Sequence, residues 1–214
     1  MAFRGWQDEA LAFFEGLEAD NSKDYWQRNK QVYEQHVRGP MEELLAELAP
    51  HWGEGRIFRP YRDVRFSSDK SPYKTHIGAM IGEGYVQLNA DGLGAGAGMY
   101  DMAADQLERY RAAVDDDETG REIEAVVSTA RSAGLQVTAH DTLKTAPKGF
   151  PKDHPRIELL RHKGLITWKE WPPAAWLGTR KAKDRIVGFL ESSKPMIAWL
   201  QSRVGPSTLP ERKR

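Results

Sequence analysis

The sequence predicts an α+β fold, in which an antiparallel meander sheet is flanked by N-terminal and C-terminal helices in a single domain. Helical periodicity fills residues 1–50 and returns near the end, whereas short alternating segments separated by glycine turns lie between. Helices flanking a run of strands are typical of α+β proteins rather than of βαβ units. At 214 residues with 40% hydrophobic side chains, the chain can bury its own core.

The first elements are helices, expected over residues 7–18, 23–37 and 40–50. Leu11, Phe14 and Leu17 recur at helical spacing in the first of them. The pair Gly39-Pro40 is expected to break the second helix, because proline suits the first turn of a new one. The third helix is expected to end near Pro50.

Strands are expected over residues 56–58, 63–66, 76–81, 85–89 and 93–100, then within 135–144 and at 164–168. Gly82-Glu83-Gly84 and Asp91-Gly92 are typical hairpin turns. Further helices are expected over residues 104–114, from Thr119 to Gly134, from Pro155 to about His162, and within 179–203. Thr119 and Glu122 have capping-box spacing. We expect one domain over residues 1–205 and a flexible polar tail over residues 206–214.

Composition excludes several classes of function. There is no cysteine, which removes thiol nucleophiles, thiolate metal sites and disulfides. Thirty-one basic and 31 acidic side chains cancel, which does not favour a protein that coats nucleic acid. No apolar run approaches the roughly 20 residues of a membrane span and no leader peptide is evident, so we expect a cytoplasmic protein without a membrane partner.

Metal and nucleotide motifs are absent from the sequence. The six histidines show no zinc-ligand spacing, although a site assembled in space from His76, His154 and acids stays open. The glycine-rich run at 92–98 lacks the Lys-Ser/Thr of a phosphate-binding P-loop. The sequence identifies no cofactor and no oligomeric state.

Residues 62–75, RDVRFSSDKSPYKT, form the densest polar segment, here called the signature segment. Its candidate ligand-binding residues are Arg62, Arg65, Lys70 and Lys74. Arginine and lysine in a rigid loop suit a phosphate or carboxylate. The alternative is that the pairs Arg62–Asp63 and Asp69–Lys70 belong to structural ion-pair networks.

Residues 144–163 form a second basic segment, with Lys148 and Lys163 as candidates for the opposite side of a shared cleft. A helix start at Pro155 would direct backbone N–H groups at an anion. The alternative is a solvated connector. For proton transfer the candidates are Tyr73, His154 and Asp69, of which histidine titrates near neutrality. Each of these could equally be a hydrogen-bonded structural group.

Three functions fit these residues. The first is a protein that binds a small phosphate- or carboxylate-bearing ligand, with or without catalysis. The second is a nucleic-acid-associated module, and the third is a non-catalytic interaction domain that uses residues 168–176.

Three runs resemble a known family: FFEGLEADNSKDYWQRNKQVYE, RDVRFSSDKSPYKTH and LKTAPKGFPKDHPRIELLRHKGL. They resemble the bacterial and fungal family called domain of unknown function 2461, from about Phe13 to Trp199. The resemblance implies a single domain with these boundaries and no particular reaction. The turn Asn21–Trp26 departs from the family pattern at several positions, so the resemblance assigns no role to its side chains.

Overall fold

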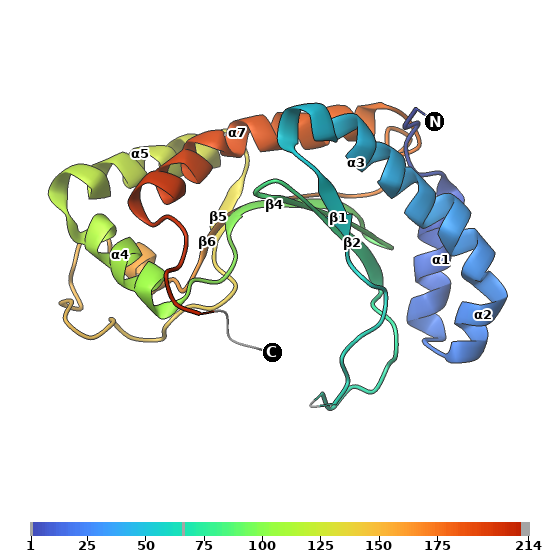
Figure 1. Ribbon diagram of the computed structural model, residues 1–214, viewed down its shortest axis with the longest axis horizontal. Helices are drawn as coiled ribbons and strands as arrows, with labels where there is room; N and C mark the ends of the chain where they lie inside the picture. The colour runs from blue at the N-terminus through green and yellow to red at the C-terminus, as the bar shows by residue number, and fades with distance from the viewer. Residues whose placement is uncertain (1, 66, 211–214) are drawn as a thin grey trace. The chain divides into compact units, whose positions relative to one another are not determined.

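The computed structural model describes residues 2–65 and 67–210, and confirms the α+β prediction (Figure 1). Six strands form one sheet in the order β1-β2-β3-β4-β6-β5. The strands are β1 (Gly55–Ile57), β2 (His76–Ile81), β3 (Gly84–Asn89), β4 (Gly92–Met99), β5 (Gln136–Thr138) and β6 (Leu165–Trp171). The predicted meander corresponds to β2, β3 and β4, which follow one another in the sheet.

The chain forms two compact units. Unit 1 consists of Met1–Ala95 and Glu170–Gly188, and unit 2 consists of Gly96–Lys169 and Phe189–Arg214. The two units are described separately below.

The helices of unit 1 are α1 (Asp8–Ala19), α2 (Lys23–Val32), η1 (Tyr33–Arg38) and α3 (Gly39–Trp52). The expected break at Gly39-Pro40 is wrong, because the π-helical segment η1 leads directly into α3. Pro40 lies in the first turn of α3, a position at which proline is common. The expected end near Pro50 is confirmed to within two residues, because α3 runs to Trp52 and stops at Gly53 with a positive φ of 86°.

Strand register gives the sheet of unit 1 two different faces. Gly55 pairs with Ile81 and Ile57 with Ala79, and a Cβ on Gly55 would meet Leu45 of α3. This face therefore packs on α3. The opposite face, here called the polar face, carries alternate residues of three segments: Arg56, Phe58, His76, Gly78, Met80, Tyr85, Gln87 and Asn89.

The strand expected over residues 63–66 is wrong for its described residues, 63–65, which form no strand. The chain instead leaves the sheet after β1 and returns to it at β2. A single bridge between Tyr61 and Tyr73 closes this excursion. Phe66, the last residue of the expected strand, lies outside the described residues.

Unit 2 contains α4 (Ala104–Asp115), α5 (Asp117–Ser132), α6 (Ile157–Arg161) and the C-terminal part of α7 (Lys181–Arg203). Tyr110, Ile123 and Leu160 are fully buried in its core. The capping box expected at Thr119 is wrong, because Asp116 caps α5 by accepting the N–H groups of Glu118 and Thr119. The expected stop at Gly134 is present with φ 75°.

The described part of the C-terminal tail is tied to α4. Ser207 and Thr208 bind the carboxylate of Asp105, and Arg109 donates to the carbonyl of Pro206. Residues 211–214 of the predicted flexible tail lie outside the described residues. No described helix combines the length and the apolar character needed to cross a membrane.

Candidate functional site

The signature segment is fixed at its base by backbone bonds and by one amide side chain. Arg62 N–H donates to Pro72 O at 2.9 Å, and Lys74 N–H donates to Pro60 O at 2.8 Å. The Asn21 side chain accepts from Tyr73 N–H at 3.1 Å and donates to Tyr73 O at 3.0 Å. The Asn21 amide thus satisfies the backbone N–H and carbonyl of Tyr73, as a neighbouring strand would. The family resemblance did not assign this role to Asn21.

Tyr73, a candidate for proton transfer, is part of an aromatic stack. Its ring is parallel to that of Trp26, with centroids 4.3 Å apart and an interplanar angle of 5°. Both rings are buried, and Trp26 also contacts Phe13 and Tyr33. Burial raises the pKa of the Tyr73 hydroxyl, which keeps it protonated at neutral pH. The ring therefore anchors the signature segment to α1 and α2.

Most charges of the signature segment are satisfied within it. Arg62 pairs with Asp69, and Arg65 pairs with Asp63 at 2.7 Å. Lys70 Nζ donates to the carbonyl of Val64 at 2.9 Å. Hydrogen bonds from Arg62 and Ser71 lower the pKa of Asp69, and those from Arg65 lower the pKa of Asp63 to about 2. Asp69 is therefore a permanent acceptor at neutral pH rather than a proton donor.

Lys74 differs from the other cations of the segment. Its Nζ lies 5.5 Å from the centroid of the Phe58 ring, and the guanidinium carbon of Arg56 lies 5.4 Å from the same centroid. Burial and the charge of Arg59 lower the pKa of Lys74. Burial and the charge of Lys74 in turn lower the pKa of His76.

Arg56, Arg59, Lys74 and His76 are here called the cationic cluster. None of them forms an ion pair with a carboxylate in the part of the chain that the structure describes. Of these four residues, only Lys74 was expected from the sequence to bind a ligand. The strand expected over residues 56–58 includes Arg56 and Phe58, but the approach of Lys74 to the Phe58 ring depends on how the chain returns to the sheet.

The polar face continues beside the cationic cluster with hydrogen-bonding and aromatic groups. The Tyr85 ring lies across Gly78, where a Cβ would come within 2.3 Å of the Tyr85 hydroxyl. That hydroxyl donates to Gln87 Oε1 at 3.2 Å, and the ring lies 6.2 Å from Phe58. A ligand at the cluster would thus meet cations, an aromatic ring and a phenolic hydroxyl.

The second basic segment belongs to unit 2, where His154 has partners for both ring nitrogens. Its Nδ1 accepts the N–H of Arg156 at 3.0 Å, and its Nε2 lies 3.0 Å from the Asp115 carboxylate. The side chain is 10% exposed. This geometry fixes the loop before α6 to the end of α4, and leaves neither nitrogen free to transfer a proton to a ligand.

Arg156 is buried and serves as a structural cap. It donates to the carbonyls of Val114 at 2.6 Å and Asp115 at 2.8 Å, at the C-terminal end of α4. Its guanidinium also forms ion pairs with Asp117 at 3.6 Å and Glu124 at 3.7 Å. This residue satisfies carbonyls that a helix end otherwise leaves without partners.

The remaining candidates of this segment are surface groups. Lys163 pairs with Asp141 and thereby lowers the pKa of that carboxyl, while Lys148 is exposed. Nearby in sequence, His140 Nδ1 lies 2.6 Å from the Tyr100 hydroxyl with the rings stacked, a pair separated by 40 residues that no sequence pattern indicated. Because the two basic segments belong to different units, their convergence on one cleft stays a prediction.

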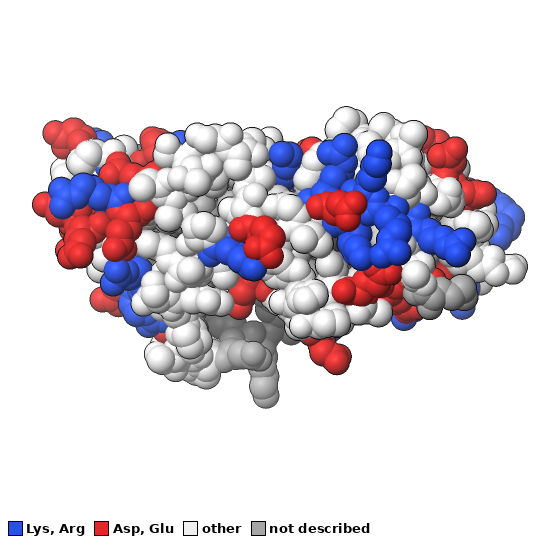
Figure 2. All heavy atoms as spheres, turned by 90° about the horizontal axis from the view of Figure 1, so that it is seen from above, with Lys and Arg blue, Asp and Glu red and all other residues white. Residues whose placement is uncertain are grey.

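A further group of cations lies at the start of α7 in unit 1. Arg180 and Lys183 both pair with Glu47, and Arg185 lies 4.5 Å from the Trp176 ring centroid. Figure 2 shows lysine and arginine gathered around acidic atoms on the face that presents α3 and the start of α7. Trp176, from the expected contact segment 168–176, is half-buried, with Arg185 against its ring.

Comparisons with known proteins give a family and no activity. No curated protein matches the chain. One solved structure, a conserved hypothetical protein Pfu-178653-001 from Pyrococcus furiosus, is similar at 15% identity with a TM-score of 0.36, over 78% of this chain and 97% of that one. The family model described as "Conserved hypothetical protein (DUF2461)" matches residues 9–199. The chain therefore belongs to the DUF2461 family.

Proposed function

We propose that unit 1 binds a small phosphate- or carboxylate-bearing ligand at the cationic cluster, on the polar face of its sheet. The observation that carries the proposal is the contrast between Lys74 and its neighbours. Arg62 and Arg65 have carboxylate partners, whereas Lys74 is partly buried beside Arg59 and Arg56 without one. Like charges held together in a desolvated position are unfavourable unless an anion joins them.

The signature segment then has a structural and a ligand-binding part. The pairs Arg62–Asp69 and Arg65–Asp63 shape the loop, and Asn21 fixes its return. Lys74 follows directly after this anchor, so its backbone is held in place before a ligand arrives, with its ammonium group beside the Phe58 ring. Preorganised cations of this kind favour binding because little side-chain freedom is lost.

Binding rather than proton transfer is the role we propose. The Tyr73 ring is buried in a stack, Asp69 is held ionised by Arg62, and both His154 nitrogens are engaged. Catalysis would therefore need a proton-transfer group supplied by the ligand or by His76, whose lowered pKa favours the neutral imidazole at pH 7.

Titration of the full chain with inorganic phosphate, at constant ionic strength and followed by NMR of the lysine ammonium groups, tests the proposal. We expect saturable shifts at Lys74, and Lys74→Gln should weaken phosphate binding by about tenfold or more. Lys70→Gln is the matched control, since it removes the same charge from the same segment outside the cluster. Equal losses in the two variants would show diffuse attraction and overturn the proposal.

The same variants separate this function from nucleic-acid binding. A single-stranded oligonucleotide that bound across many basic side chains would lose affinity steeply with salt. Lys70→Gln and Lys74→Gln would then weaken it to similar extents, and such a result would favour the nucleic-acid alternative over a small ligand.

A further inference from the structure

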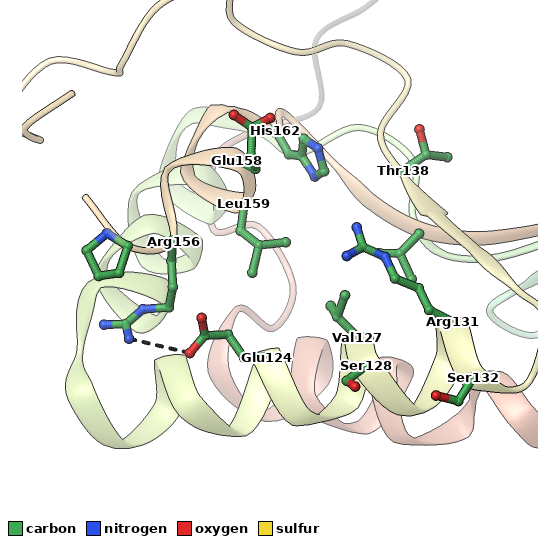
Figure 3. Close-up of a pocket in the computed structure, with 12 residues that line it drawn as sticks. Glu124, Val127, Ser128, Arg131, Ser132, Thr138, Arg156, Glu158, Leu159 and His162 are labelled. Carbon is green, nitrogen blue, oxygen red and sulfur yellow. Dashed lines mark ion pairs between the residues drawn. The ribbon is translucent and has the colours of Figure 1, made fainter. Parts of the chain in front are cut away.

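Unit 2 contains a hollow of about 730 Å³ between α5, β5 and α6 (Figure 3). It lies within a single unit and is distinct from the cationic cluster. Val127 of α5 and Leu159 of α6 form part of its lining, and both belong to the hydrophobic core of the unit. Although both are largely buried, they give the hollow a part-apolar lining against which the body of a small molecule could pack.

One cation at this hollow lacks an acidic partner. Arg131, in the last turn of α5, makes no ion pair with any residue that the structure describes. The acids that line the hollow are already engaged, Glu124 with Arg156 at 3.7 Å and Glu158 with Arg161 at 3.2 Å. The dipole of α5 favours a cation at this position but leaves the guanidinium donors without an acceptor.

A polar atom without a partner lies at the same place. His162 Nδ1 is buried and has no hydrogen-bond partner among the described residues. The ring also lines the hollow, and Figure 3 shows His162 and Arg131 directed toward the space between α5 and α6. A buried polar atom without a partner is rare in folded proteins, so this nitrogen is open to a hydrogen bond from or to a ligand in the hollow.

The charges around His162 are consistent with a neutral ring that can donate one hydrogen bond. Burial lowers its pKa most, Arg131 and Arg161 lower it further, and Glu158 opposes them. Arg131 and His162 line the same hollow, so one small ligand bound there can contact both.

We propose that this hollow binds a small carboxylate with an apolar body. The Arg131 guanidinium binds the carboxylate through paired N–H donors, and His162 Nδ1–H donates to the same group. The apolar body lies on Val127 and Leu159. Inorganic phosphate lacks this body, so the hollow selects for the apolar part of the ligand, which the proposal for the cationic cluster of unit 1 does not require.

NMR titration of the full, ¹⁵N-labelled chain with phenylacetate tests this site. We expect saturable shifts of the His162 ring nitrogens and a rise in the His162 pKa, because a bound carboxylate favours the charged imidazole. Phenethylamine, with the same ring and the opposite charge, should cause neither change. Shifts of equal size with both compounds would overturn the proposal, as would no saturable shift with phenylacetate.

Two variants and one control complete the test. Arg131→Gln should weaken phenylacetate binding by about tenfold or more, and His162→Phe, which keeps the ring but removes the donor, should also weaken it. Arg121→Gln removes the same charge from an exposed position of α5 outside the hollow, and should change affinity by less than about twofold. Equal effects of Arg121→Gln and Arg131→Gln would overturn the proposal. Phosphate binding by Arg131→Gln should be unaltered, which separates this result from the test of Lys74.

Discussion

The two basic segments of this protein look alike in sequence, yet their arginines have different kinds of partner. In the signature segment, Arg62 and Arg65 pair with carboxylates seven and two residues away, on the surface. In residues 144–163, Arg156 is buried and binds carbonyls about 40 residues away, at the end of α4. Local pairing shapes a loop, whereas the long-range cap joins elements of a core. A cation-rich segment can therefore bind an anion only where at least one of its cations has no acidic partner within the protein.

The largest expected effect is that of Arg156→Met on stability. Removing the guanidinium leaves the carbonyls of Val114 and Asp115 without their donor. We expect the free energy of unfolding to fall by roughly 3 kcal/mol or more, measured by denaturant unfolding. Lys152→Met, an exposed lysine of the same segment, should change it by less than about 0.5 kcal/mol. Similar values for the two variants would remove the distinction between a structural arginine and a surface cation.

A smaller effect is expected at the anchor of the signature segment. Asn21→Ala removes both side-chain bonds to the backbone of Tyr73. The free energy of unfolding should fall by about 1–2 kcal/mol, with faster hydrogen exchange at the Tyr73 amide. Asn29→Ala is the control, because Asn29 makes one local bond within α2. If exchange at Tyr73 is unchanged in Asn21→Ala, the segment is held by its aromatic stack alone.

Much of the fold could be predicted from local patterns. Leu11, Phe14 and Leu17 mark α1 by their spacing, and the glycine turns separate β2, β3 and β4. These signals succeed because each depends on neighbouring residues. The strand expected over residues 63–66 is wrong for residues 63–65, where the side chains of Asp63 and Arg65 pair with each other instead of alternating across a sheet.

The candidate sites depend on contacts that no local pattern contains. The cationic cluster brings Arg56 and Lys74 to one Phe58 ring across an excursion of the chain. The hollow of unit 2 sets Arg131 opposite His162, from helices joined through β5 and a long loop. Two local basic segments predicted an anion-binding site, but which cations lack partners is a property of the folded chain.

The smallest expected effect concerns the surface pair Asp63–Arg65. It tests whether the arginines of the signature segment pair locally with individual carboxylates. Hydrogen bonds from Arg65 lower the pKa of Asp63 from 3.8 to about 2. A carboxyl whose pKa is lowered by folding stabilises the folded state above its unfolded pKa, and loses that contribution as the pH falls through the folded value. The pair should therefore persist at pH 4 and be lost as the pH approaches 2. Because both side chains are exposed, solvent screening keeps the effect on global unfolding small.

The titration of the Asp63 carboxyl carbon by ¹³C NMR measures this pair directly. In Arg65→Gln the Asp63 pKa should return toward 3.8, because the main hydrogen-bond donor to the carboxylate is gone. Arg62→Gln should leave it near 2, since Arg62 pairs with Asp69 instead. A shift of equal size in both variants would mean that Asp63 responds to the general field of the segment. Arg62 and Arg65 would then share their carboxylates instead of each having its own. The contrast with Lys74, which has no carboxylate partner, would be lost.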